Sequence, residues 1–165
     1  MSKNLLLISN STNYGEAYLS WPRKHIKSFL DETTAKRVLF IPYAGVNLSD
    51  QGLTASFDAY EERVKAVFAE LGYELYSIHQ CADAVQAVKD AEAIAVGGGN
   101  TFHLVYMMHK MKIMDVMRER VLQGLPYMGW SAVSNVACPT LRTTNVMPII
   151  EPESYRCLDV IPSQI

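Results

Sequence analysis

The stretch AIAVGGGNTF, residues 93–102, gives the clearest indication of the fold class. Its apolar run from Ala93 to Val96 predicts a short strand, the three glycines predict a tight turn, and a helix is predicted from Thr101, behind Asn100. Four more short apolar runs occur along the chain, at 5–8, 38–41, 75–78 and 125–128. None of them alternates polar with apolar residues, which is typical of strands covered on both faces of a parallel sheet.

Helical patterns lie between these runs. The clearest extends from about Phe57 to Leu71, and a second extends from about Trp21 to Leu30 with Ser20 as its predicted cap. Further helices are predicted from Asp83 and from Thr101. This alternation predicts an α/β fold, a doubly wound three-layer sandwich with a mainly parallel sheet.

Composition narrows the class of protein. The chain has 165 residues, 49% of them hydrophobic, and we expect a single α/β hydrolase-type domain over residues 1–165. Its 15 basic and 17 acidic residues are spread along the chain, so we expect neither a nucleic-acid nor a membrane partner. The apolar run near the amino terminus is too short for a signal peptide, and we expect a cytoplasmic protein. Its three cysteines, Cys81, Cys138 and Cys157, have no CxxC spacing, so neither a disulfide framework nor a metal site is predicted.

The glycine loop is the first stretch that could support chemistry, because ligands of doubly wound folds bind beyond the carboxyl ends of the strands. It has neither the lysine of a phosphate loop nor the GxGxxG spacing of a dinucleotide site. Two interpretations remain open. The glycines serve a tight strand-to-helix turn, or they supply a backbone amide to an oxyanion hole.

The second such stretch is GWSAVSNVACPT, residues 129–140, in which Ser131 follows an apolar run. In a nucleophile elbow, G-x-S-x-G, the serine occupies a sharp strand-to-helix turn and the next amide faces the oxyanion. Gly129, Ser131 and Ala132 fit this design, whereas Val133 stands where the second glycine belongs. The alternative interpretation is that Ser131 caps the following helix.

Five stretches together resemble the peptidase E family of aspartyl dipeptidases, over essentially all 165 residues. They are NLLLISNST, VLFIPYAGV, AVGGGNTFHL, GWSAVSNVACPT and LRTTNVMPI. The resemblance implies a fold similar to that of the class I glutamine amidotransferases, with Ser131 as nucleophile and the amides of Gly99 and Ala132 in the oxyanion hole. It also implies hydrolysis of small acidic dipeptides with an amino-terminal aspartate, without a metal or cofactor.

Three departures from the family pattern lower the activity that we expect. Val133 replaces the second glycine of the elbow, and Val146 stands where the family has an aspartate of the charge relay. The family's histidine lies just past the stretch that matches IPSQI. The chain is therefore expected to end, at Ile165, before the position of this histidine. It is also expected to lack the carboxyl-terminal part of the fold. A serine without a base is a weak nucleophile. We therefore expect very weak activity or none; the alternative is an inactive paralogue that binds acidic peptides or a protein partner.

Other residues are candidates for the missing base and for substrate binding. Among the four histidines, only His79 directly follows a predicted strand, which makes it the candidate surrogate base. The other three, His25, His103 and His109, fall in helical patterns and are expected at the surface. Candidate substrate-binding residues are Asn100, Arg142 and Asn145, although Arg142 could equally pair with a structural acid. An incomplete sheet would expose an edge, so a homo-oligomer is also expected to be possible.

Overall fold

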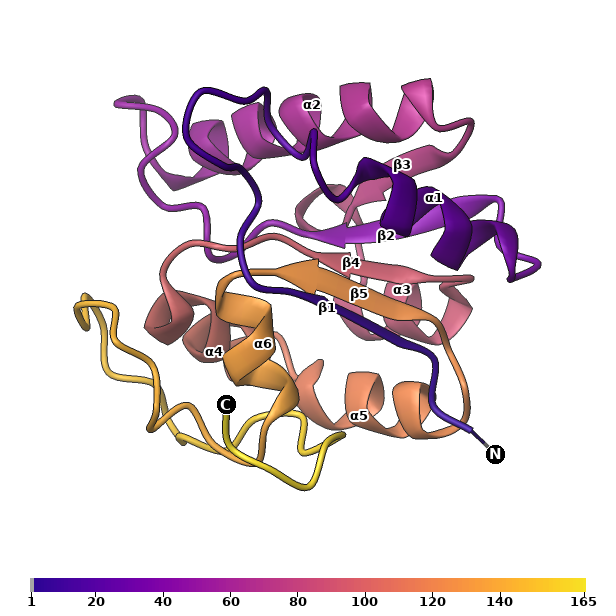
Figure 1. Cartoon of the computed structure of the whole chain (residues 1–165). Coiled ribbons are helices and arrows are strands. Elements are labelled where there is room, and N and C mark those ends of the chain that lie inside the picture. The colour runs from indigo at the N-terminus through magenta and orange to yellow at the C-terminus, as the bar shows by residue number, and fades with distance from the viewer. Residues whose placement is uncertain (1) are drawn as a thin grey trace.

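The computed structural model describes residues 2–165, which form a five-stranded parallel sheet between two layers of helices (Figure 1). The strands lie in the order β1-β5-β4-β2-β3, and every pairing is parallel. Their bounds are β1 Leu5–Ile8, β2 Arg37–Ile41, β3 Glu74–Ser77, β4 Ile94–Val96 and β5 Tyr127–Trp130.

The helices cover both faces of this sheet, as the sequence predicts. One face is covered by α1 Arg23–Asp31 and α2 Leu53–Glu70. The other is covered by α3 Ala84–Asp90, α4 Thr101–Lys110, α5 Met114–Leu122 and α6 Ala132–Ala137. A short 3-10 helix, η1 Ile78–Gln80, follows β3. The predicted α/β three-layer architecture is therefore confirmed.

Successive residues of a strand enter opposite cores. In β2, Val38 and Phe40 pack under α1 and α2, whereas Leu39 and Ile41 pack against the α3 to α6 layer. Helices cover both faces of the strand, so its buried positions are apolar and only Arg37 at its start is exposed; this explains the unbroken apolar runs in the sequence. Among the described residues, no helix is both long enough and apolar enough to cross a bilayer.

Two local predictions were wrong. The last strand is Tyr127–Trp130 instead of 125–128, because Gly129 takes a central position in the sheet, opposite Leu7 of β1 and Val96 of β4. A Cβ at Gly129 would lie 2.5 Å from the Val96 carbonyl oxygen, so this position requires glycine. The first helix begins after Pro22, and no side chain caps it, so Ser20 is not its cap.

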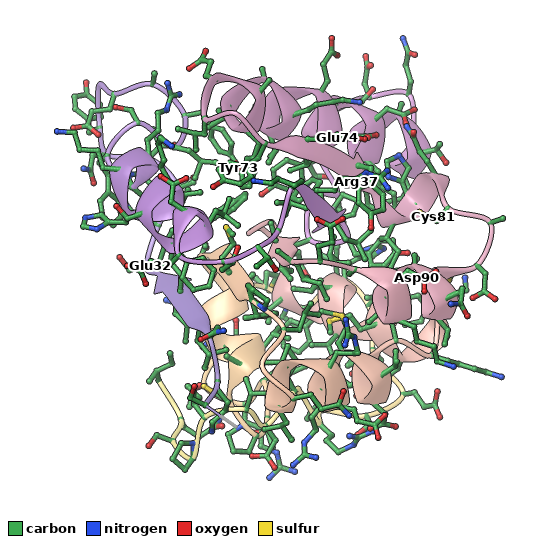
Figure 2. The ribbon with its side chains drawn as sticks, turned by 90° about the vertical axis from the view of Figure 1, so that its right-hand side faces the viewer. Glu32, Arg37, Tyr73, Glu74, Cys81 and Asp90 are labelled. Atoms are coloured by element: carbon green, nitrogen blue, oxygen red, sulfur yellow. The ribbon has the colours of Figure 1, made fainter. Side chains whose placement is uncertain are left out.

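The amino ends and the carboxyl ends of the strands carry different groups of residues. At the amino ends, Arg37 of β2 and Glu74 of β3 lie side by side and form a 3.1 Å ion pair (Figure 2). At the carboxyl ends, the neighbouring strands β4 and β5 bring the glycine loop after Val96 next to Ser131. The two stretches selected from the sequence therefore meet at one edge.

Candidate active site

Ser131 occupies a turn that L-amino acids seldom adopt. It directly follows β5 and precedes α6, with φ 60° and ψ −111°, outside the usual allowed regions. Its amide donates to the Ile8 carbonyl of β1 over 2.9 Å, which fixes the turn to the sheet. The side chain makes no capping hydrogen bond to α6, and the residue is exposed. The helix-cap interpretation is therefore wrong, and the geometry is that of a nucleophile elbow.

The glycine loop lies against this turn. A Cβ at Gly98 would lie 2.5 Å from the Trp130 carbonyl oxygen and 2.6 Å from the Cβ of Ser131. Gly99 has φ +141°, and a Cβ there would clash with the carbonyl of Ala44. Because only glycine permits these approaches, the loop backbone can pack directly against the serine.

Two backbone amides beside Ser131 are free to donate. Within residues 2–165, neither the Gly99 amide nor the Ala132 amide forms a hydrogen bond. Ala132 is the first residue of α6, and Gly99 is the residue after the glycine that contacts the serine. Their part in an oxyanion hole remains a prediction, and both amides are available for it.

Val133 is accommodated without loss of the elbow. Its side chain is fully buried, and both of its γ-carbons would lie 2.6 Å from a Cβ at Gly129. The missing side chain of Gly129 thus provides the space that Val133 fills. One glycine gives enough clearance between β5 and α6, and Ser131 retains its turn.

Two cavities meet at Ser131. The first, about 480 Å³, lies between the glycine loop, Trp130 and two tyrosines, Tyr18 and Tyr60. The second, about 470 Å³, lies on the side of α6 and of the segment after Thr143. Ser131 and Val146 line both cavities, so the hydroxyl can be reached from either one.

Aromatic side chains hold the first cavity in shape. The indole nitrogen of Trp130 donates to the hydroxyls of Tyr18, over 2.9 Å, and of Tyr60, over 3.1 Å. The Tyr60 hydroxyl in turn donates to the Gly98 carbonyl over 2.9 Å. Burial raises the pKa of both tyrosines, so their hydroxyls stay neutral and keep their protons for donation. This network fixes the glycine loop beside the serine.

Arg63 is the only charged side chain among the described residues that line the first cavity. Its guanidinium carbon lies 5.4 Å from the ring centroid of Tyr18, and it forms no ion pair within residues 2–165. The apolar face of its helix gives no sign of Arg63, which lies outside that face. Its spacing of three from Tyr60 was the available signal, since such residues are neighbours on a helix.

The structure does not bring His79 to Ser131. The strand before it, β3, is three places from β5 in the sheet, about 14 Å at the usual strand spacing. Its Nε2 lies 2.9 Å from Asp58 Oδ1, and this hydrogen bond holds the pKa of the Asp58 carboxyl below its usual value. Within residues 2–165, no histidine lines either cavity beside Ser131.

Another histidine prediction was wrong. His103 was expected at the surface, but it is buried in α4, where its Nδ1 contacts the Tyr43 carbonyl over 2.5 Å. The helical pattern was correct; the residue faces the core because that hydrogen bond satisfies its ring nitrogen. His25 is exposed, and His109 is half-buried with its Nε2 on the Arg156 carbonyl.

The three predicted substrate-binding residues lie in different places. Asn100 lines the first cavity, but its side chain is engaged by the fold: its oxygen accepts from the His103 amide and its nitrogen donates to the Met147 carbonyl. Asn145 lines the second cavity. Arg142 is exposed and lines neither. Their contacts with a substrate remain predictions.

Known proteins of the peptidase E group are similar to this chain in sequence. Peptidase E of Nostoc sp. strain PCC 7120 is 50% identical over all 165 residues, and peptidase E of Shewanella sp. strain MR-4 is 44% identical. The chain spans 65% and 66% of the length of these two proteins.

A protein of known structure from Listeria monocytogenes EGD-e superposes with a TM-score of 0.68 at 19% identity, over 96% of this chain and 75% of that one. At this identity the likeness concerns the fold. The model of peptidase family S51 matches residues 5–165. With the serine elbow and glycine loop in place at one edge of the sheet, the chain belongs to peptidase family S51.

Proposed function

We propose that this chain contains the nucleophile and substrate pocket of a serine dipeptidase that cleaves dipeptides with an amino-terminal aspartate. The observation that carries the proposal is Ser131, whose exposed hydroxyl caps no helix and stands on a strained turn beside the free amides of Gly99 and Ala132. Attack on a peptide carbonyl needs this combination of nucleophile and amide donors.

Arg63 is the proposed partner of the substrate's aspartate side chain. Of the described residues that line the first cavity, it alone is charged, and that cavity opens on Ser131. A guanidinium binds a carboxylate through two parallel hydrogen bonds, which an uncharged side chain cannot match. This assignment favours a small acidic dipeptide as the ligand.

The base is proposed to enter at the second cavity. Ile165 lines this cavity together with Ser131, and its carbonyl accepts hydrogen bonds from Asn135, over 3.1 Å, and Thr143, over 2.9 Å. The family resemblance places the histidine just after the residues that match IPSQI. A histidine placed there would start beside the serine, and the 165 residues without it are expected to be nearly inactive.

The test is hydrolysis of Asp-Leu by the purified chain and by Ser131→Ala. A chimera extended with the carboxyl-terminal third of the Nostoc protein is measured beside them. We expect the 165-residue chain to show only a weak rate and the chimera to gain several orders of magnitude, because a missing triad member costs up to about 10⁶ in kcat. A chimera that folds but stays as slow as its Ser131→Ala variant would contradict the proposal.

Specificity is tested in the active chimera with Arg63→Gln. We expect kcat/KM for Asp-Leu to fall about 100-fold or more, a loss of roughly 3 kcal/mol for a charged hydrogen-bonded pair, while that for Asn-Leu changes little. Lys65→Gln is the control, because Lys65 is on the same helix but lines a different cavity. Equal losses for both substrates would exclude Arg63 from recognition.

A second candidate function is an inactive binding module for acidic peptides or a protein partner. The observation that favours it is Val146, an apolar residue that lines both cavities where the family resemblance places a relay aspartate. Calorimetric binding of Asp-Leu to the chimera without any turnover would support this function over the first.

A further inference from the structure

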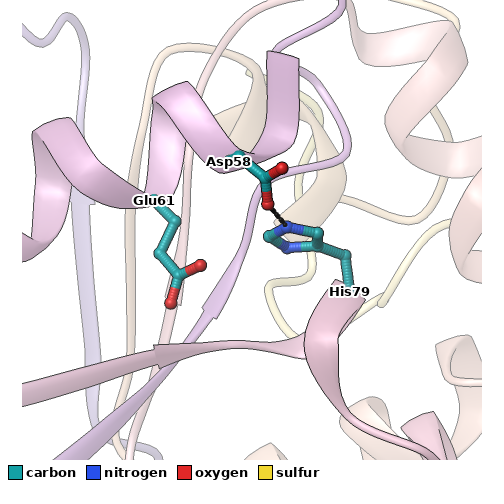
Figure 3. Close-up of side chains that lie close together, drawn as sticks. All are labelled: Asp58, Glu61 and His79. Atoms are coloured by element: carbon teal, nitrogen blue, oxygen red, sulfur yellow. Dashed lines mark hydrogen bonds and ion pairs between the residues drawn. The ribbon is translucent and has the colours of Figure 1, made fainter. Parts of the chain in front are cut away.

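Three side chains with metal-binding chemistry lie together outside the candidate active site. Asp58 and Glu61 are one turn apart on α2, and His79 follows β3 in η1 (Figure 3). One ligand atom from each residue lies within 4.8 Å of the other two. Since β3 is the edge strand furthest from Ser131 along the sheet, this cluster is separate from the serine elbow.

Glu61 is the member that the fold alone does not explain. It is only 6% exposed, and within residues 2–165 it forms neither a hydrogen bond nor an ion pair. Although most of the residue is covered, it lines an open cavity together with Asp58, so a ligand can reach its carboxylate from solvent. Its oxygen reaches the same small volume as the oxygen of Asp58 and the ring nitrogen of His79.

His79 is held as a metal-binding histidine usually is. Its Nδ1 lies 2.5 Å from the hydroxyl oxygen of the buried Ser77, which fixes the ring, and its Nε2 faces Asp58 at 2.9 Å. Metal-binding histidines commonly have their second nitrogen fixed by such an outer partner. Nε2 is therefore oriented toward the carboxylates.

We propose that Asp58, Glu61 and His79 form a binding site for one Zn²⁺ ion between α2 and η1. Zinc binds imidazole nitrogen and carboxylate oxygen at about 2.0 to 2.2 Å, and tetrahedral ligands at that distance are about 3.3 Å apart. The three atoms lie within 4.8 Å of one another, so binding requires side-chain rotations that shorten their separations to this spacing. Two carboxylates balance the charge of the ion. An open cavity gives access and room for a water as fourth ligand; it is lined by Asp58, Glu61, Glu62, Lys65 and Gln80.

The test is calorimetric titration of Zn²⁺ into the tag-free chain after chelator treatment, with thermal unfolding measured in parallel. We expect one ion per chain, and a midpoint of unfolding that rises with Zn²⁺ concentration because the ion binds the folded state. Glu61→Gln is expected to weaken binding by more than tenfold, since loss of even an outer partner costs about 10- to 100-fold. Glu62→Gln is the matched control, a neighbouring carboxylate on the same cavity, and should bind as the wild type does.

Folding is monitored independently, so that a loss of binding is interpretable. Without metal, Glu61→Gln is expected to unfold at about the same temperature as the wild type, because Glu61 forms no hydrogen bond or ion pair within residues 2–165 that the substitution would remove. The proposal is overturned if the folded wild-type chain takes up no Zn²⁺ at this site. It is equally overturned if Glu61→Gln binds as tightly as the wild type, or if Glu62→Gln loses as much affinity.

Discussion

Ser131 stores backbone strain that its surroundings maintain. A residue in a sparsely populated region costs of order 1–3 kcal/mol, and here the Ile8 carbonyl, the Gly98 contact and the buried Val133 hold the turn in place. The G-x-S pattern identified this residue from the sequence. The sequence did not reveal whether Val133 would distort the elbow, because that depends on the space above Gly129 in the folded sheet.

At this scale we predict different effects on the free energy of unfolding when the hydroxyls of two buried tyrosines are removed. Tyr60→Phe removes the hydroxyl that donates to the Gly98 carbonyl and accepts from Trp130, and we expect it to lower the free energy of unfolding by about 1–3 kcal/mol. Tyr127→Phe is the matched control, since the Tyr127 hydroxyl is buried without a partner in residues 2–165, and it should be neutral or stabilising. Urea denaturation measures both. A Tyr60→Phe variant as stable as the wild type would show that the network does not hold the loop.

At the scale of elements, two helices begin with a side-chain cap that the sequence predicts. The predicted starts at Asp83 and behind Asn100 are confirmed, because each side chain accepts from the amide three residues on. Such caps are local and readable from sequence. Ser20 failed as a cap because the helix starts only after Pro22. The second role of Asn100, its bond to the Met147 carbonyl, joins residues 47 apart and has no local signal.

Two substitutions separate these roles of Asn100. Asn100→Asp keeps the oxygen that caps α4 but loses the donor to Met147, so we expect near-normal stability and faster proteolysis of residues 142–150. Asn100→Ala loses both contacts and should also cost about 0.5–2 kcal/mol of stability. Asp83→Ala is the control, a loss of cap only, and should leave the proteolysis rate unchanged. If Asn100→Asp is cleaved no faster than the wild type, the bond to Met147 does not anchor this segment.

At the scale of the whole molecule, the segment after α6 closes one face of the fold. It passes below α4 and α6 in Figure 1 and buries Cys157, Leu158 and Val160 in the core on that side. The amides of Leu158 and Val160 donate to carbonyls at the end of α6. This packing places Ile165 at the second cavity.

The reaction rates of the cysteine thiols measure how firmly this segment covers the core. Burial raises the pKa of Cys157 from 9.0 to about 12, and both Cys157 and Cys138 are buried, whereas Cys81 is partly exposed. With a disulfide reagent at pH 8, we expect Cys81 to react first and Cys157 at least about 10³ times more slowly, because it must wait for opening of the core.

The same shift in the pKa of Cys157 contributes to the loss of stability at alkaline pH. A pKa raised in the folded state favours folding fully below pH 9, and this contribution is lost as the pH rises from 9 toward 12.

Cys81→Ser is the control for the reaction with the disulfide reagent. It should abolish the fast reaction and leave the slow reaction of Cys138 and Cys157 unchanged. Equal rates for Cys81 and Cys157 would mean that the segment is open in solution.

The amino-acid sequence alone was enough to predict the α/β architecture, the order of strands and helices along the chain, and the candidate serine. Continuous apolar runs are required wherever both faces of a strand are buried, and turns and caps act over only a few residues. Tertiary packing alone brings Arg63 to the cavity beside Ser131, keeps His79 away from it, and brings Asp58 and Glu61 to His79. The reason is that periodicity encodes which side of an element is buried. Which strands become neighbours depends on pairing between residues far apart in the chain.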